Sequence, residues 1–290
     1  MEPVSRPASR VSGPVSGSTP LPLSAISPAS LRQLQWILAD IDDTITTDGR
    51  LTAAAYQALE ALEADGLKPV LVTGRPAGWC DMIARFFPVD AVVGENGAFW
   101  FRYERDSRRM RRSYFIDAAE RARARARLDQ LAAAIPAAVP GATVAADQAY
   151  RVADLAIDFA EDTGPLAPEQ IEQIVRMFRE AGAEAKVSSI HVNGWFGDYD
   201  KLRMTERLFA EAYGVDLEAV LDRVAFIGDS ANDEPMFARF PWSFGVANVK
   251  AFLPRMKTGP AYVTAGEAGA GFVEFATAVL EARQSQPVRS

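Results

Sequence analysis

Residues 34–44 read LQWILADIDDT, an apolar run that leads directly into a cluster of carboxylates. A continuous apolar run of this kind is typical of a parallel strand that is buried on both faces. A helix is predicted next over residues 51–65, with Thr52 as its N-cap. A second buried strand, LKPVLVT, ends at Thr73, and another helix is predicted over residues 77–87. This alternation of strands and helices predicts a doubly wound α/β sheet.

The pattern changes from residue 88 onward. Asn96-Gly97 lies between two strand-like runs, which is a strong hairpin signal. The segment RVADLAIDFAED alternates, with Leu155 and Ile157 on one face and Asp154 and Asp158 on the other, as expected for a half-buried antiparallel strand. Helices at 117–135 and 168–181 and strands at 111–116 and 186–196 complete this region. We therefore predict an inserted α+β cap over residues 88–193.

The rest of the chain returns to the alternation of buried strands and helices seen before residue 88. A helix is predicted from Lys201, the strand RVAFIGD ends at Asp229, and a closing helix covers residues 266–283. The predicted fold class is therefore α/β, a doubly wound, Rossmann-like parallel-sheet core formed by residues 34–87 and 194–283. Residues 1–31 are rich in Ser and Pro and are predicted to form a disordered tail. The alternatives for this segment are an organelle-targeting sequence and a wrongly assigned translation start.

Composition narrows the class of partner. The 290-residue chain has a formal net charge of -7, which argues against nucleic acid as the main partner. No apolar run approaches the length of a membrane-spanning helix, so no membrane partner is expected. Cys80 is the only cysteine, which excludes an internal disulfide and makes the reducing cytoplasm the default location. The sequence does not predict an oligomeric state.

Polar residues follow the predicted strands at corresponding positions. Asp40 and Asp42 follow the first strand, Thr73 ends the second, and Asp229 ends a later one, with Asn232 and Asp233 just beyond. Lys201 opens the helix that follows the predicted cap. The carboxyl ends of parallel strands share one edge of a sheet, where ligands bind. We therefore expect these side chains to converge on one site.

The chemistry of such a cluster is restrictive. Carboxylates brought together repel one another and raise each other's pKa values, and a bound divalent cation removes this repulsion. Few carboxylates, completed by water and phosphate oxygens, are typical of a Mg²⁺ site. The Thr73 hydroxyl and the Lys201 ammonium would hold phosphoryl oxygens. A metal-oriented carboxylate can then attack phosphorus, while a second carboxylate two residues away exchanges the proton.

The segments DIDDT, LVTGR, GDYDKL and GDSANDEPM, in this order, resemble the four motifs of the haloacid dehalogenase-like phosphatase superfamily. The resemblance implies that Asp40 is the nucleophile and Asp42 the general acid/base, with the Asp42 backbone carbonyl also bound to Mg²⁺. It implies that Thr73 and Lys201 bind phosphate and that Asp229 ligates the metal, supported by Asp233. GENGA at 94–98, the α+β insertion and GDSAND followed by Met236 resemble the IIB branch, which includes sucrose-phosphate and mannosyl-phosphoglycerate phosphatases.

The expected activity is therefore Mg²⁺-dependent hydrolysis of a small phosphorylated metabolite, a sugar phosphate in particular. The catalytic candidates are Asp40, Asp42, Thr73 and Lys201, and the metal candidates are Asp40, Asp42, Asp229 and Asp233. The candidate phosphate- and substrate-binding residues are Thr44, Gly74, Arg75, Asn96, Arg151 and Asn232. A phosphomutase on the same scaffold and a non-enzymatic metabolite-binding protein are the alternatives.

Several candidates have simpler explanations. Hairpin geometry alone explains Asn96-Gly97, and Arg151 is equally consistent with a surface arginine and with a substrate-anion contact. His191 is interpreted as a structural or surface residue rather than a substrate contact. The ten arginines between Arg102 and Arg127 are interpreted as a solvated face, with steering of anionic metabolites as the alternative.

Overall fold

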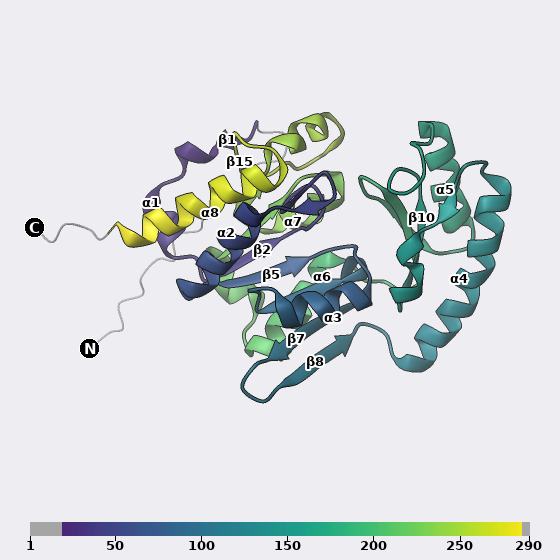
Figure 1. The fold of residues 1–290 in the computed structure, drawn as a ribbon, viewed down its shortest axis with the longest axis horizontal. Coiled ribbons are helices and arrows are strands. Elements are labelled where there is room, and N and C mark those ends of the chain that lie inside the picture. Colours follow the sequence, from purple (N-terminus) through teal and green to yellow (C-terminus); the bar gives the residue numbers. More distant parts are fainter. Residues whose placement is uncertain (1–18, 286–290) are drawn as a thin grey trace, which may run out of the picture.

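We analysed a computed structural model of the chain, which describes residues 19–285. Two sheets organise these residues (Figure 1). The larger sheet has nine strands in the order β1-β15-β14-β13-β2-β5-β6-β7-β8, and the smaller has four in the order β11-β12-β10-β9. Among the described helices, none is both long and apolar enough to cross a membrane.

The larger sheet is parallel from β1 to β6 and antiparallel from β6 to β8. Its strands are β1 (Leu21–Pro22), β2 (Trp36–Ala39), β5 (Lys68–Val72), β6 (Ala91–Gly94), β7 (Phe99–Glu104), β8 (Arg109–Tyr114), β13 (Val224–Gly228), β14 (Trp242–Gly245) and β15 (Tyr262–Val263). A small hairpin, β3 (Thr46–Thr47) and β4 (Arg50–Leu51), follows β2. The predicted doubly wound α/β fold class is confirmed.

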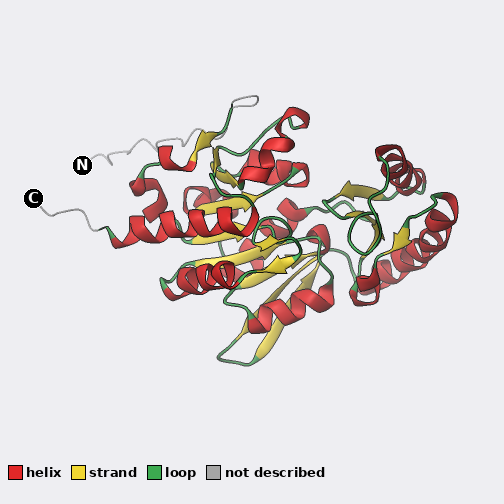
Figure 2. Ribbon diagram, turned by 45° about the horizontal axis from the view of Figure 1, so that its top comes forward, coloured by secondary structure: helices red, strands yellow, loops and turns green. Residues whose placement is uncertain are grey.

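Helices cover both faces of this sheet (Figure 2). They are α1 (Pro28–Arg32), α2 (Ala53–Ala64), α3 (Ala77–Phe86), α6 (Lys201–Leu208), α7 (Glu234–Arg239) and α8 (Ala268–Gln284). In β2, Ile37 and Ala39 pack in one apolar cluster with α2, α3 and α8, whereas Trp36 and Leu38 pack in another with α6 and α7. Successive strand residues point to opposite faces, so a strand that is apolar throughout suits a sheet covered on both sides.

The smaller sheet is antiparallel and lies at one end of the molecule (Figure 1). It consists of β9 (Thr143–Val144), β10 (Asp154–Asp158), β11 (Glu184–Val187) and β12 (His191–Trp195). Helices α4 (Ala118–Ala138) and α5 (Pro168–Glu180) cover its outer face, where Leu155, Ile157 and Phe178 form a separate apolar core. We call residues 118–195 the cap.

The cap is smaller than the sequence predicted. Residues 88–193 were assigned to the insertion, but β6, β7 and β8 extend the larger sheet. Phe99 and Phe101 pack in one core cluster and Trp100 in the other, so these strands are covered on both faces like the rest of the core. The hairpin signal at Asn96-Gly97 marked a change from parallel to antiparallel pairing, and it was misinterpreted as a domain boundary.

Part of the segment predicted to be a disordered tail belongs to the folded core. Residues 1–18 lie outside the described part of the chain, but residues 19–31 are ordered against the core. Ser27 caps α1 by accepting a hydrogen bond from Ser30 N at 3.2 Å, and Pro28 occupies the first turn. Leu23, Ile26 and Leu31 are buried in the cluster that includes α8. These apolar contacts and the pairing of β1 with β15 hold this Ser/Pro-rich segment against the core.

Candidate active site

The predicted strand-end residues meet at one edge of the larger sheet. Asp40 follows β2, Thr73 follows β5 and Asp229 follows β13, and these three parallel strands are neighbours in the order β13-β2-β5. The backbone continues the pairing for one residue beyond β2 and β5, since Asp40 N donates to Ile227 O at 3.0 Å and Thr73 N donates to Val93 O at 2.9 Å. The sheet therefore fixes where these side chains begin.

Lys201 connects the two acidic segments of the site. It is the first residue of α6, and the preceding Asp200 caps that helix by accepting a hydrogen bond from Arg203 N at 2.8 Å. The Lys201 ammonium donates to Asp40 Oδ1 and Asp233 Oδ1, both at 2.8 Å. Burial alone would lower the pKa of Lys201, but Asp233 and Asp40 outweigh it and raise that pKa above its ordinary value. The lysine therefore stays charged.

Three buried carboxylates lie close enough to share a cation. One oxygen each of Asp40, Asp229 and Asp233 lies within 4.8 Å of the others. Burial raises the pKa of Asp40 to about 7, with Lys201 opposing the shift and Asp233 and Asp42 adding to it. Burial, followed by Asp233 and Asp40, also raises the pKa of Asp229. One ammonium does not balance three carboxylates, and this oxygen-only donor set fits Mg²⁺.

Asp42 is held by Arg75 and not by Lys201. Its carboxylate receives hydrogen bonds from Arg75 Nε at 3.0 Å to each oxygen, and from Arg75 Nη2 at 2.8 Å to Oδ1. The guanidinium group of Arg75 also lies over the Trp79 ring, 4.6 Å from its centroid. Asp42 thus adds no carboxylate to the cation-binding group, and its predicted contact to Mg²⁺ through the backbone carbonyl stays a prediction.

The phosphate-binding candidates cluster beside Thr73. Its Oγ1 accepts a hydrogen bond from Arg75 N at 3.0 Å. The Asn96 amide lies against Gly74, because a Cβ built at Gly74 would come within 3.2 Å of Asn96 Oδ1. Asn96 adopts φ 55°, and its buried Nδ2 has no hydrogen-bond partner among the described residues. Thr44 Oγ1 is buried and unpartnered in the same sense. Asn96 lines the cleft between cap and core, so a bound phosphoryl group or substrate hydroxyl could accept a hydrogen bond from its Nδ2.

A narrow, polar cleft lies between the cap and these core residues. Asp40, Asp42, Gly74, Asn96, Asp229 and Asn232 line it from the core. The cap contributes Arg151, Asn193 and the turn from Ser188 to His191. Asn232 Oδ1 accepts a hydrogen bond from Ser230 Oγ at 2.9 Å. The polar face of β10 and β12 therefore faces the core, which explains why Asp154 and Asp158 are buried although the alternation predicted an exposed face.

Arg151 is buried between cap and core, so the alternative that it is a surface arginine is wrong. Its side chain is 1% exposed. It donates to both oxygens of Asp147 at 2.9 Å, to Gly74 O at 2.9 Å and to Asp154 Oδ1 at 3.1 Å. Through these bonds the guanidinium group connects Asp147 and Asp154 of the cap to Gly74 in the LVTGR segment of the core. A contact between Arg151 and a substrate anion stays a prediction.

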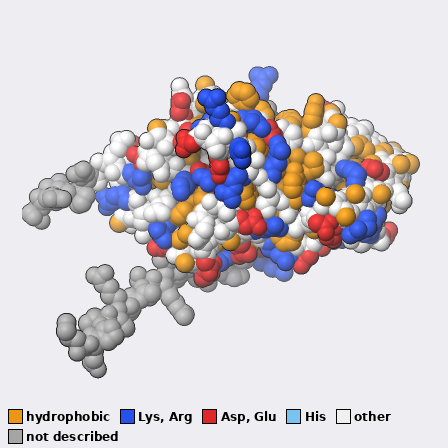
Figure 3. Space-filling model, turned by 90° about the horizontal axis from the view of Figure 1, so that it is seen from below, with side chains coloured by type: hydrophobic (Ala, Val, Ile, Leu, Met, Phe, Trp, Pro, Cys, Tyr) orange, Lys and Arg blue, Asp and Glu red, His pale blue; other side chains and the backbone are white. Residues whose placement is uncertain are grey.

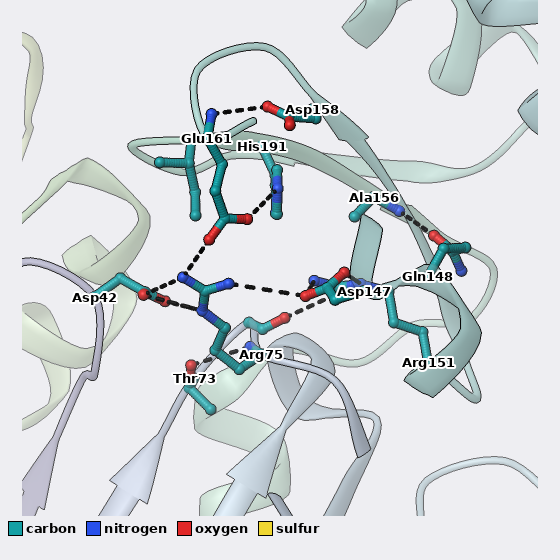
Figure 4. A network of polar contacts seen from close by, with 12 residues as sticks. Asp42, Thr73, Arg75, Asp147, Gln148, Arg151, Ala156, Asp158, Glu161 and His191 are labelled. Atoms are coloured by element: carbon teal, nitrogen blue, oxygen red, sulfur yellow. Dashed lines mark hydrogen bonds and ion pairs between the residues drawn. The ribbon is translucent and has the colours of Figure 1, made fainter. Parts of the chain in front are cut away.

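Sequence reasoning missed Glu161, a cap residue that reaches the site. Its Oε1 lies 2.9 Å from Arg75 Nη2, and its Oε2 lies 2.9 Å from His191 Nε2 (Figure 4). The His191 contact, followed by Arg75, lowers the pKa of Glu161 to about 2, although partial burial opposes this. The only sequence signal was an acidic pair at the end of the alternating strand, which does not indicate a partner 86 residues away.

Glu95 was also missed, although GENGA was singled out. Its carboxylate accepts hydrogen bonds from the backbone of Ala77 at 2.9 Å in the core. It also accepts them from Val152 at 2.9 Å, Ala153 at 2.6 Å and Asp154 at 3.1 Å in the cap. Glu95 therefore ties the start of α3 to the start of β10 and helps to hold the cap over the site.

The arginine-rich segment forms a mixed surface. Figure 3 shows Lys and Arg side chains gathered around the middle of the face that carries the β7–β8 hairpin, with acidic side chains among them. Arg102 pairs with Asp90, Arg111 with Glu104 and Arg112 with Asp81. These contacts are consistent with the solvated-face interpretation, and the cleft is not lined by these arginines.

The first part of the chain matches a known protein family. A family model described as haloacid dehalogenase-like hydrolase matches residues 37–119. None of the curated protein sequences matches the chain. The predicted resemblance to the haloacid dehalogenase-like superfamily is therefore confirmed for the segment that carries Asp40, Asp42 and Thr73.

Solved structures share the fold at low sequence identity. The C-terminal domain of a C. albicans trehalose-6-phosphate phosphatase is 13% identical with a TM-score of 0.65, covering 91% of this chain and 99% of its own. A Synechocystis sucrose-phosphatase, solved with sucrose and phosphate, is 16% identical with a TM-score of 0.58, covering 86% and 98%. A sugar phosphatase of haloacid dehalogenase subclass IIB is 16% identical with a TM-score of 0.55, covering 84% and 96%.

Proposed function

From its relationship to the haloacid dehalogenase-like hydrolases, we propose that this chain is a Mg²⁺-dependent phosphatase that hydrolyses a small sugar phosphate. The observation that carries the proposal is the buried group of Asp40, Asp229 and Asp233, with Lys201 joining Asp40 to Asp233. The sugar-phosphate phosphatases among the structures with this fold favour the same substrate class. A bound Mg²⁺ would supply positive charge to the phosphoryl group, with Asp40, Asp229 and Asp233 as its carboxylate partners.

The proposed reaction has two steps. In the first, a carboxylate oxygen of Asp40 attacks phosphorus, the ester P–O bond breaks, and Asp42 protonates the departing alcohol. In the second, Asp42 accepts a proton from water as the water oxygen attacks the phospho-aspartate, which releases phosphate and restores Asp40. Lys201, the Thr73 hydroxyl and the Gly74 backbone N–H would hold the phosphoryl oxygens throughout. Asp42 must turn from Arg75 toward the leaving oxygen to act.

Phosphate release tests this proposal. Wild-type protein is incubated with a panel of sugar phosphates and p-nitrophenyl phosphate, with Mg²⁺ or with EDTA. We expect phosphate release in the presence of Mg²⁺ but not in the presence of EDTA. In Asp40→Asn we expect the rate of release to fall roughly 10³-fold or more. The matched control is Asp48→Asn. Asp48 is an exposed carboxylate in the loop that follows Asp40, and Asn tolerates its φ of 50°.

Two results would contradict the proposal. Folded wild-type protein that releases no phosphate from any compound would exclude the phosphatase. Turnover that requires a sugar bisphosphate and yields an isomeric sugar phosphate would indicate a mutase instead. The fold of each variant is checked by circular dichroism before its activity is compared.

A further inference from the structure

A second cleft adjoins the first and has more room. It lies between β11 and β12 of the cap and the starts of α6 and α7. Asn96 and Asn232 line both clefts, and Lys201, which contacts Asp40, lines the second. The first cleft has a cavity volume of about 20 Å³, enough for about one water molecule, whereas the second has about 190 Å³. A leaving group joined to a phosphoryl group at Asp40 therefore finds room in the second cleft.

The uncommitted groups that line the second cleft are mostly hydrogen-bond donors. Asn96 Nδ2 and Trp195 Nε1 are buried and have no partner among the described residues. Lys186 forms no ion pair or hydrogen bond within that part of the chain. Asn232 uses its Oδ1 to accept a hydrogen bond from Ser230, which leaves its amide N–H groups to donate. Amide N–H, indole N–H and ammonium groups donate hydrogen bonds and cannot accept them.

The acceptors that line the second cleft are fewer. Asp198 contacts Arg203 at 2.6 Å, and Asp200 accepts a hydrogen bond from Arg203 N as the cap of α6. The Tyr199 hydroxyl is buried without a partner among the described residues, and it can donate as well as accept. Glu184, which is exposed on β11, is then the carboxylate that remains uncommitted. The second cleft therefore has a surplus of donors.

The register of the smaller sheet places Lys186 closer to the first cleft than Glu184. Across β11 and β12, Lys186 pairs with Asn193 and Glu184 pairs with Trp195. Opposite residues of antiparallel strands are neighbours on one face, with Cβ atoms roughly 5 Å apart. Asn193 lines the first cleft, whereas Trp195 lines the second. Lys186 therefore lies beside the junction of the two clefts, and Glu184 lies one pair further from it.

We infer that the second cleft binds the leaving group, and that Lys186 is a specificity residue that selects leaving groups carrying a carboxylate. A carboxylate offers only acceptors, so it satisfies the surplus donors, and the ammonium group offsets its charge. An alcohol hydroxyl must also donate, and it finds few uncommitted acceptors in this cleft. The inference rests on the proposed phosphatase function and narrows it to a sugar phosphate that also bears a carboxylate, such as a phosphorylated sugar acid.

Matched pairs of phosphomonoesters test the inference. Glycerol 3-phosphate is compared with 3-phosphoglycerate, and glucose 1-phosphate with glucuronic acid 1-phosphate, since a carboxylate replaces one CH₂OH group in each pair. For wild-type protein we expect kcat/KM to favour the carboxylate member of at least one pair about threefold or more. In Lys186→Gln we expect this preference to disappear through a higher KM for the carboxylate member, whereas Lys186→Arg, which keeps the charge, should retain most of it.

Two further measurements separate recognition from folding and from turnover. Lys250→Gln, at an exposed lysine that lines neither cleft, is the control and should leave the ratio within each pair unchanged. The thermal unfolding midpoint of Lys186→Gln should match that of wild type, because Lys186 has no partner among the described residues. Calorimetric binding to Asp40→Asn should favour the carboxylate member of the same pair, and the difference should shrink in Asp40→Asn/Lys186→Gln.

The outcomes distinguish the inference from the proposed function. If wild-type protein hydrolyses phosphomonoesters but prefers the neutral member of both pairs, the inference is wrong while the phosphatase function stands. A carboxylate preference that survives in Lys186→Gln would place its recognition outside the second cleft, and it would overturn the inference in the same way. If neither pair nor p-nitrophenyl phosphate is hydrolysed with Mg²⁺, the proposed function fails and the inference fails with it.

Discussion

At the scale of single residues, Lys201 determines the electrostatics of the site. Its buried ammonium is the hydrogen-bond donor to both Asp40 and Asp233. Replacing it by Gln leaves buried carboxylates without their cation. We expect Lys201→Gln to lower the free energy of unfolding by about 3–5 kcal/mol at neutral pH, measured by urea denaturation without metal.

Lys250→Gln, at an exposed lysine, is the control for this substitution and should change stability by less than about 0.5 kcal/mol. The cost of Lys201→Gln should shrink toward pH 5, because burial raises the pKa of Asp40 to about 7 and protonation then removes its charge. An unfolding free energy for Lys201→Gln equal to that of wild type would show that the ion pairs do not stabilise the fold.

The three clustered carboxylates lead to a prediction about metal. A cation that binds only the folded protein stabilises it, by about 2.7 kcal/mol when its concentration is 100 times its Kd. We expect Mg²⁺ to raise the thermal unfolding midpoint of wild-type protein and EDTA to reverse the rise. Asp229→Asn should lose most of this response, whereas the exposed Asp48→Asn should keep it. A midpoint that does not respond to Mg²⁺ would argue against the cation site.

The residues of the candidate active site differ in how well the sequence predicts them. Asp40, Thr73 and Asp229 could be placed because each ends a buried parallel strand, and parallel strands bring their carboxyl ends to one edge. Glu95 and Glu161 could not, because their partners belong to other elements and no local pattern indicates them. Arg151 was ambiguous for the same reason, since its burial depends on how the cap sits on the core.

At the scale of elements, the turn at residues 95–97 holds α6 in place. A Cβ built at Gly97, where φ is 107°, would lie 2.0 Å from Asp200 O and 2.9 Å from Lys201 N. The turn therefore touches the backbone that begins α6. We expect Gly97→Ala to destabilise the protein by more than about 3 kcal/mol and to lower kcat by displacing Lys201.

Gly214→Ala separates the cost of a positive φ from the cost of the steric contact with Asp200. Gly214 also has a positive φ of 68°, but no described atom lies within 4 Å of a Cβ built there. We expect a loss of only about 1 kcal/mol, with unchanged kcat. Similar losses in both variants, compared by urea denaturation and by phosphate release, would show that the contact between Gly97 and Asp200 is not important.

Local patterns predicted elements better than their assignment to domains. The helix at Ala53–Ala64 begins beside its predicted cap, since Thr52 Oγ1 accepts a hydrogen bond from Ala55 N at 3.2 Å. The strand β7 was expected too, but its place in the larger sheet depends on pairing with β6. Pairing and burial are long-range properties, so residues 91–114 could not be assigned to the core from local patterns.

At the scale of the whole molecule, we expect the contact between cap and core to depend on pH. The pKa of Glu161 is lowered from 4.5 to about 2 by His191 and Arg75. A lowered carboxyl pKa gives stability that is present above pH 4.5 and is lost as the pH falls toward 2. We expect Glu161→Gln to be less stable than wild type at pH 7 and the difference to shrink below pH 4.5.

Glu161 is partly exposed, and solvent therefore screens its contacts. This limits the difference in unfolding free energy between wild type and Glu161→Gln at pH 7 to about 1 kcal/mol. Urea denaturation at a series of pH values measures it. The control Glu172→Gln, at an exposed glutamate of α5, should follow the wild-type curve throughout. A difference that is constant with pH would mean that Glu161 contributes packing rather than charge.

The two ends of the larger sheet have a consequence for the behaviour of many copies in solution. The final strands are β8 on one side and β1 on the other. An open strand offers unpaired backbone groups to other chains and can seed aggregation. Here β8 carries Arg109, Arg111 and Arg112, while β1 has two residues, one of which is Pro22 and lacks an N–H. Charged side chains at one border and a missing donor at the other therefore discourage the sheet from extending into a fibre.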